Sequence, residues 1–239
     1  MSALDERVVG GDGRPRVVLA GPAEGQVGVV LICEVFGIDD TTRDYADKLV
    51  AEGYGVAMPD LWWRRPPPPM GTPEEVGAAA AAVVDSEAMQ DLTTAFRALS
   101  GFRHRFALGF CLGGLYARMA GSALPGLAGA VEFYGRIVYP VVTPAKAVQP
   151  LDLLPGLGCP LQCHFGADDP VAPPEHVDEL ERRLAARGKP WQVFRYPGCG
   201  HAFMNPRRPR WRPAEAATAW ARALTFIRHV TAEREATAG

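Results

Sequence analysis

Cys111 lies in the sequence Gly-Phe-Cys-Leu-Gly-Gly at residues 109–114, directly after a segment at residues 105–110 that predicts a β-strand. The pattern Gly-x-Cys-x-Gly is typical of a sharp strand-to-helix turn, where small neighbours leave room for a strained nucleophile. A helix that begins here would favour a thiolate through its dipole and direct the N–H of Leu112 at an oxyanion. The spacing predicts nucleophilic catalysis by a thiol. The alternative is a buried cysteine in a tight turn.

A candidate base and a candidate acid follow the cysteine along the chain, and each comes directly after a predicted strand. Asp168 and Asp169 follow the strand predicted at residues 161–165, and the glycine-flanked His201 follows the strand predicted at residues 191–196. A nucleophile, an acid and a histidine in this order fit the triad of acyl-transfer enzymes. The spacing alone leaves either aspartate as the acid.

Glu34 stands at the end of an almost continuously apolar segment, residues 26–33. A carboxylate at the tip of a central strand is costly to bury unless another group pairs with it. One interpretation is a second acid or base close to Cys111, with the N–H of Val35 as a second donor to the oxyanion. The other is a loop carboxylate in solvent.

The elements that must position these residues alternate along the chain. Strands are predicted at residues 16–20, 26–33, 54–58, 105–110, 128–134, 161–165 and 191–196. Helices are predicted at residues 41–52, 112–121, 174–187 and 211–229, with one or two more within residues 74–99. This alternation predicts an α/β fold, a mostly parallel central sheet with helices on both faces and the ligand site beyond the carboxyl ends of the strands. We expect one domain over residues 1–239, with 1–15 and 231–239 loosely attached.

Composition excludes several classes of partner. The chain has 25 basic and 27 acidic side chains, a net charge of −2, so no general attraction to nucleic acid or to an anionic membrane is expected. No segment is long and apolar enough to span a membrane, and the first residues lack the apolar core of a secretory signal. Five cysteines do not suggest a disulfide framework, which favours the reducing cytoplasm. Cys159 and Cys163 lack a second pair of ligands, so no metal site is expected.

The sequence resembles the dienelactone hydrolase family of the α/β-hydrolase superfamily over about residues 27–227. The matching motifs are Cys33-Glu34-Val35-Phe36-Gly37, Pro59-Asp60-Leu61-Trp62, Gly109-Phe110-Cys111-Leu112-Gly113-Gly114, Phe133-Tyr134-Gly135, His164-Phe165-Gly166-Ala167-Asp168-Asp169, Gly200-His201-Ala202-Phe203 and Ala219-Trp220. The order and spacing of these motifs agree with the family as well as their residues do.

The resemblance implies a role for each candidate residue. It makes Cys111 the nucleophile, His201 the base and Asp169, the third residue after Gly166, the acid. It also implies that Glu34 helps to remove the thiol proton when substrate binds. The backbone N–H groups of Val35 and Leu112 would form the oxyanion hole, and Tyr134 would line the pocket.

One departure from the family concerns substrate binding. The family holds a substrate carboxylate with two arginines; Arg64, with Arg65 beside it, fits the first position, but Asn205 stands at the second and Arg207 and Arg208 follow later. The loop at residues 61–69, with two tryptophans and four prolines, is expected to form an apolar pocket wall; the alternative is that its tryptophans pack on the sheet edge. The predicted substrate-binding residues are Arg64, Tyr134, Trp62, Phe36, Asn205 and Phe203.

Taken together, these observations predict a hydrolase that cleaves an ester or lactone, of the dienelactone or carboxymethylenebutenolide type, through a thioester on Cys111. A broad carboxylesterase or thioesterase, or a hydrolase of other electrophiles such as phosphotriesters, is the alternative on the same triad. A binding or redox-sensing protein, with Cys199 near His201, is the non-enzyme alternative. No cofactor is implied. The expected partner is a small-molecule substrate, and the expected state is a monomer or a small homo-oligomer.

Overall fold

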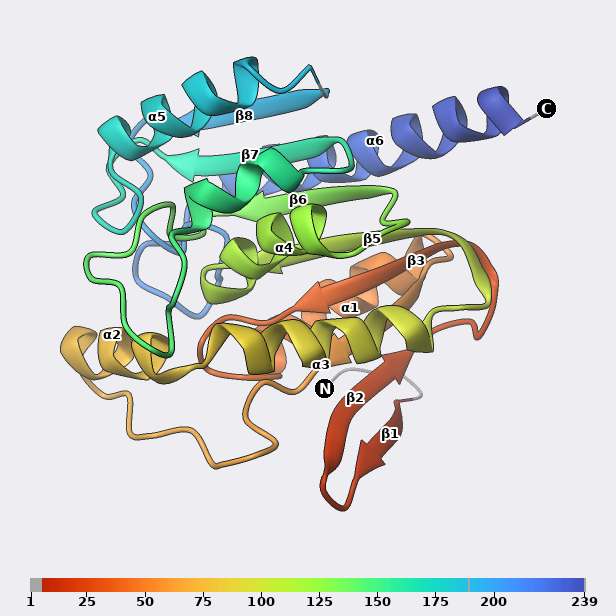
Figure 1. Ribbon diagram of the computed structural model, residues 1–239, viewed down its shortest axis with the longest axis horizontal. Helices are drawn as coiled ribbons and strands as arrows, with labels where there is room; N and C mark the ends of the chain where they lie inside the picture. The colour runs from red at the N-terminus through yellow and green to blue at the C-terminus, as the bar shows by residue number, and fades with distance from the viewer. Residues whose placement is uncertain (1–5, 189, 239) are drawn as a thin grey trace.

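Residues 6–188 and 190–238, which the computed structural model describes, form one eight-stranded sheet with strand order β1-β2-β4-β3-β5-β6-β7-β8 (Figure 1). The strands are β1 (Arg7–Gly11), β2 (Arg14–Ala20), β3 (Gly25–Ile32), β4 (Gly55–Pro59), β5 (Phe102–Phe110), β6 (Gly129–Phe133), β7 (Leu161–Gly166) and β8 (Trp191–Tyr196). Strands β3 to β8 are parallel, whereas β1 and β2 are antiparallel at one edge. The carboxyl ends of β3, β5, β7 and β8 therefore meet at one edge of the sheet.

Helices cover both faces of the sheet, as the alternation predicts (Figure 1). The helices are α1 (Asp40–Ala51), α2 (Pro73–Ala82), α3 (Asp85–Ala98), α4 (Leu112–Ala123), α5 (Pro174–Ala185) and α6 (Pro213–Ala238). Helices α3, α4 and α5 contribute to the hydrophobic cluster on one face, and α1 and α6 to that on the other. Helix α2 lies beside the edge where the parallel strands end.

The central strands are apolar on both sides because both of their faces are covered. In β3, Val30 and Ile32 pack with α3 and α4, whereas Val29 and Leu31 pack with α1 and α6. All four side chains are essentially inaccessible to solvent. This two-sided burial explains why the segment is continuously apolar rather than alternating.

The two ends of the chain differ from expectation. Residues 7–11, expected to be loose, form β1, which pairs with β2, and Glu6 accepts a 2.8 Å hydrogen bond from Arg43. The last helix does not end at residue 229 but continues to Ala238. Residues 1–5 and 239 lie outside the described residues.

The interior connections also add detail to the expected elements. Residues 74–99 hold two helices, α2 and α3, and the connection between β6 and β7 contains a 3₁₀ helix, Pro150–Gly156. Helix α2 begins with a capping box between Thr72 and Glu75. None of the helices in the described residues is long and apolar enough to cross a membrane.

Candidate active site

Cys111 occupies a strained turn between β5 and α4. Its backbone has φ 54° and ψ −114°, and α4 begins at the next residue, Leu112. A Cβ on Gly113 would lie 2.2 Å from the carbonyl oxygen of Ile32, and one on Gly109 would lie 2.1 Å from the carbonyl oxygen of Gly113. Only glycine fits both positions, which explains the Gly-x-Cys-x-Gly spacing. The N–H of Leu112 belongs to the first turn of α4, whose N–H groups have no partner within the helix.

His201 connects Cys111 to Asp169. Its Nε2 lies 3.1 Å from Cys111 Sγ, and its Nδ1 lies 2.9 Å from Asp169 Oδ2. The other Asp169 oxygen accepts a 2.8 Å hydrogen bond from the N–H of Val171, and the carboxylate is buried. Asp168 is exposed instead. The structure thus brings together the cysteine, the histidine and the second of the two candidate aspartates.

The electrostatics of this trio favour a charged histidine. Burial alone lowers the pKa of His201, but the sulfur of Cys111 and the carboxylate of Asp169 raise it to about 10. Below that pH the imidazole is an imidazolium that donates to both neighbours. This arrangement can hold a thiolate ready for attack.

Glu34 faces the same cavity as Cys111, yet its hydrogen bonds go elsewhere. Its Oε2 accepts a 2.8 Å hydrogen bond from Asn205 Nδ2, and its Oε1 accepts one of 3.2 Å from the hydroxyl of Tyr134. The residue is 6% exposed, and burial raises the pKa of its carboxyl group. Its partners are therefore two neutral donors, Tyr134 just after β6 and Asn205 after β8.

A cavity of about 810 Å³ opens over Cys111 and His201. Its apolar lining comes mainly from the following side chains: Phe36, Met70, Val76, Leu112, Leu115 and Tyr139. Arg136, Arg208 and Arg210 also line it, and Arg208 stacks on Phe36 at 3.9 Å. None of these three guanidinium groups forms an ion pair within the described part of the chain. The site can therefore take a largely apolar substrate that carries negative charge.

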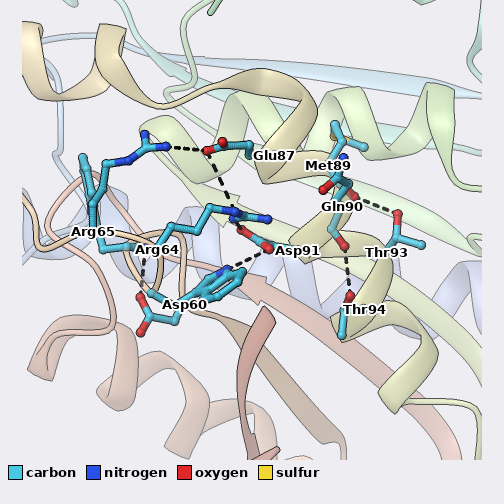
Figure 2. Close-up of polar contacts among 11 residues, drawn as sticks. Asp60, Arg64, Arg65, Glu87, Met89, Gln90, Asp91, Thr93 and Thr94 are labelled. Carbon is cyan, nitrogen blue, oxygen red and sulfur yellow. Dashed lines mark hydrogen bonds and ion pairs between the residues drawn. The ribbon is translucent and has the colours of Figure 1, made fainter. Parts of the chain in front are cut away.

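Arg64 does not reach this cavity, contrary to expectation. Its guanidinium donates a 2.6 Å hydrogen bond to Asp91 on α3, which also accepts one of 3.0 Å from Trp63 Nε1. Figure 2 shows this cluster, with Arg65 paired to Glu87 beside it. Because Asp91 is buried, its carboxylate holds Arg64 in place. The loop is thus fastened to α3, and the adjoining residues from Met70 onward line the cavity instead.

Of the other predicted substrate-binding residues, only Phe36 lines the cavity. Trp62 is buried and donates from Nε1 to the carbonyl oxygen of Val35, at 2.8 Å. Tyr134 and Asn205 lie behind the cavity wall, where both donate to Glu34, and Phe203 is fully buried beside Tyr134. These three belong to the support of the site rather than to its lining. The N–H of Val35 remains predicted as an oxyanion donor.

Sequence reasoning missed two parts of the lining. Helix α2 contributes Val76 and Ala80, and the segment after β6 contributes Arg136, Tyr139 and Lys146. The latter segment is fastened to α3 because Lys146 and Tyr139 both donate to Asp85, at 2.8 and 2.9 Å. An alanine-rich helix and a proline-containing loop carry no pattern that points to a pocket, so no local signal marks them.

The Asp91 cluster gives a test of how the loop is held. Asp91→Ala is expected to lower the free energy of unfolding by about 2 kcal/mol, because two half-buried donors lose their buried acceptor. Arg65→Gln removes an exposed pair and is expected to cost less than about 0.5 kcal/mol. Urea unfolding followed by circular dichroism measures both. Equal losses in the two variants would contradict the assignment of Asp91 as the anchor.

The remaining cysteines are buried away from any ligand cluster. Burial raises the pKa of Cys199 and of Cys33. Cys163 donates to Glu132, and Cys159 to the carbonyl oxygen of Gly121. No group of three or more histidine, cysteine or acidic side chains within residues 6–188 and 190–238 is arranged to hold a metal ion.

Comparison with known proteins agrees with this geometry. The dienelactone hydrolase family matches residues 16–231 of the chain. A Bradyrhizobium protein named "Probable 2-oxo-3-(5-oxofuran-2-ylidene)propanoate lactonase" is 30% identical over 241 residues, which cover 97% of each chain. A carboxymethylenebutenolidase from Rhodococcus opacus is 27% identical over 207 residues, which cover 83% of this chain and 79% of the relative.

Solved structures agree in fold. A Klebsiella pneumoniae protein described as a "Putative Dienelactone Hydrolase" superposes with a TM-score of 0.82 at 25% identity, covering 93% of this chain and 96% of the other. A promiscuous phosphotriesterase similar to dienelactone hydrolases shares the fold with a TM-score of 0.75 at 19% identity, covering 95% of this chain and 99% of the other. The chain therefore belongs to the dienelactone hydrolase family, has the α/β-hydrolase fold, and is a hydrolase of carboxylic esters or lactones.

Proposed function

We propose that the chain hydrolyses an anionic enol lactone or activated ester through a thioester on Cys111. The observation that carries this proposal is the contact of His201 with both Cys111 Sγ, at 3.1 Å, and Asp169 Oδ2, at 2.9 Å. A nucleophile, a base and an orienting acid in one hydrogen-bonded row are the arrangement that acyl transfer requires.

The proposed reaction has two steps. The thiolate of Cys111 attacks the carbonyl carbon, and the N–H groups of Leu112 and Val35 stabilise the resulting oxyanion. Collapse breaks the carbonyl carbon–oxygen single bond, and His201 gives its proton to the leaving oxygen, which leaves a thioester. Neutral His201 then takes a proton from water, the hydroxide attacks the thioester, and the thiolate leaves as the carboxylic acid product forms.

The nucleophile itself favours an activated substrate. In the tetrahedral intermediate the thiolate competes with the leaving oxygen, and a poor alkoxide loses this competition. An enolate or an aryl oxide is a better leaving group than an alkoxide or an amide nitrogen. An enol lactone or aryl ester is therefore the proposed substrate class, and amides are not.

The cations that line the cavity support a negatively charged substrate. Arg136, Arg208 and Arg210 have no carboxylate partner among the described residues, and Glu34, the acidic residue in the described lining, is already hydrogen-bonded. The names of the Bradyrhizobium and Rhodococcus relatives, a propanoate lactonase and a carboxymethylenebutenolidase, both describe substrates with a carboxylate. We assign the recognition of this group to Arg136 and Arg208, which are half-buried, rather than to Arg64.

This assignment predicts a preference for charge. The p-nitrophenyl ester of adipic acid with its second carboxylate free is expected to have a kcat/KM about tenfold above that of the matching methyl ester, because guanidinium groups meet the carboxylate. The preference should fall with rising salt, and the double variant Arg136→Gln/Arg208→Gln should lose it. Arg207→Gln, whose guanidinium is exposed and paired with Asp44, is the matched control. Equal rates for the two esters would contradict an anionic substrate.

The proposed reaction is tested with p-nitrophenyl acetate and with a dienelactone. Rapid mixing with excess aryl ester should give a burst of nitrophenol, and acid quenching followed by peptide mass analysis should find the acetyl group on Cys111. Turnover of both substrates supports a dienelactone-type hydrolase. Turnover of the aryl ester alone keeps the thioester mechanism and moves the substrate to a broad carboxylesterase class, and an acyl group on another residue overturns the proposal.

The cellular setting is proposed on separate grounds. An odd number of cysteines, five, is not typical of a disulfide framework and is in keeping with the reducing cytoplasm, where disulfides are rare. We propose a cytoplasmic enzyme that acts on a small molecule as a monomer or a small homo-oligomer.

A further inference from the structure

The hydrogen bonds of both Glu34 carboxylate oxygens go to donors other than the thiol of Cys111. Asn205 Nδ2 donates to Oε2 at 2.8 Å, and the hydroxyl of Tyr134 donates to Oε1 at 3.2 Å. Cys111 Sγ is instead 3.1 Å from His201 Nε2. The thiol therefore already has a base as its neighbour, while Glu34 is held by two donors that belong to other parts of the fold.

Asn205 ties the segment that follows His201 to the rest of the fold. Its Oδ1 accepts hydrogen bonds from Thr41 Oγ1, at 3.1 Å, and from the N–H of Arg207, at 2.9 Å. Its own N–H donates to the carbonyl oxygen of Ala202, which has a positive φ of 63°. Asn205 is buried, and the amide thus joins the end of β3, the start of α1 and the turn that begins at His201.

The hydrogen bond from Asn205 to Glu34 connects the turn after His201 to the end of β3. Strand β3, in the middle of the sheet, ends just before Glu34, whereas the turn after His201 contains a left-handed residue. A neighbouring bond, from the hydroxyl of Tyr45 to the carbonyl oxygen of Met204 at 2.8 Å, fastens the same turn to α1. Losing the Glu34 bond would leave the buried amide of Asn205 without its acceptor.

We propose that Glu34 is a positioning residue that fixes His201 through Asn205, and that His201 alone activates Cys111 before any substrate binds. This inference rests on the proposed function, because it concerns the same nucleophile. It differs from the role that the family resemblance implies for Glu34, a base that acts on the thiol when substrate arrives.

The charged surroundings of the pair are consistent with a thiolate in the free enzyme. His201 contacts Asp169 through Nδ1, the ring nitrogen that does not face Cys111. The ring of Tyr134 packs edge-on against the imidazole, with 5.2 Å between the ring centroids. Arg208 and Arg210 line the same cavity, and Glu34 is the acidic residue among its described lining. The positive groups around Cys111, His201 included, thus outnumber the two buried carboxylates, those of Glu34 and Asp169.

Exchanging the acid and the amide separates the two roles. In Glu34→Gln/Asn205→Asp the new amide can donate to the new carboxylate, and the hydroxyl of Tyr134 can still donate to the amide oxygen. Glu34→Gln alone is expected to lower kcat/KM for p-nitrophenyl acetate by about 10- to 100-fold, because a misplaced base costs rates of this order. The double variant is expected to recover a kcat/KM within about threefold of the parent. Asn205→Asp alone places a second carboxylate against that of Glu34, and its kcat/KM should therefore be reduced. A double variant as slow as Glu34→Gln would overturn the proposal.

The state of the thiol is measured directly in the parent protein. The rate of alkylation by iodoacetamide, measured at pH 7 without substrate, should be about tenfold above that of free cysteine, because the thiolate is the reactive form of the thiol. His201→Asn should lose this excess, Glu34→Gln should lose part of it because His201 is displaced, and Glu34→Gln/Asn205→Asp should restore it. A Glu34→Gln variant that keeps the parent rate, or a double variant that stays as slow as Glu34→Gln, would sink the inference. An acyl group on Cys111 would still support the proposed function in that case.

Discussion

Replacing Cys111 with alanine is expected to lower kcat for p-nitrophenyl acetate by about 10⁵-fold, the scale of loss when the nucleophile of a catalytic triad is removed. The sulfur is the atom that His201 Nε2 contacts at 3.1 Å, and its strained backbone, with φ 54°, presents it at the start of α4. The cavity and the N–H of Leu112 survive the substitution, so a small residual rate from binding and oxyanion stabilisation remains. Steady-state release of nitrophenol, with purified protein and a matched blank, measures the loss.

Cys199→Ala is the control for this experiment. Cys199 is a fully buried thiol two residues before His201, and it contacts neither the cavity nor Cys111. Its loss is expected to leave kcat within about threefold of the parent, since only a small core side chain is trimmed. If the protein instead needed Cys199 as a resolving thiol, Cys199→Ala would abolish its function. Catalysis that persists in Cys111→Ala would bring forward the binding or redox-sensing alternative.

The triad residues could be predicted because their positions follow from topology. Cys111, Asp169 and His201 each come directly after a strand, and the carboxyl ends of parallel strands meet at one edge whatever the details of packing. The glycines at 109 and 113 are required by backbone contacts of 2.1 and 2.2 Å, and such steric requirements leave a trace in the sequence. The resemblance selected Asp169 over its neighbour, and the structure pairs that residue with His201.

The residues that line the cavity could not be predicted in the same way. Arg64 has the expected position in the chain, but Asp91, on a helix that begins twenty-one residues later, captures its guanidinium. Likewise Asn205 donates inward to Glu34, whereas Arg208, three residues on, lines the cavity. Where a long side chain points depends on tertiary partners that lie far away in sequence. A motif fixes the backbone position of such a residue and leaves its direction open.

Asp169→Asn is expected to lower kcat by about 10⁴-fold, although it keeps the size and shape of the side chain. The carboxylate accepts from His201 Nδ1 at 2.9 Å and from the N–H of Val171 at 2.8 Å, so both of its oxygens are used as acceptors. An amide in this place either turns its NH₂ group toward the histidine or loses the bond. The imidazole then takes the wrong tautomer, with the proton on Nε2 and no base facing Cys111.

Asp168→Asn is the matched control, because the same change is made one residue away. Asp168 is exposed, and its backbone N–H, which bonds to the carbonyl oxygen of Cys199, is kept in the variant. Its kcat is expected to stay within about threefold of the parent, as for a surface change distant from the reacting atoms. Asp169→Asn should also lower the pKa of His201 in the free enzyme. The substitution removes one of the two groups that raise this pKa to about 10. A low kcat in Asp168→Asn beside a normal kcat in Asp169→Asn would exchange the roles of the two aspartates. Equal losses of kcat in both variants would indicate a structural effect on the turn rather than orientation of the base.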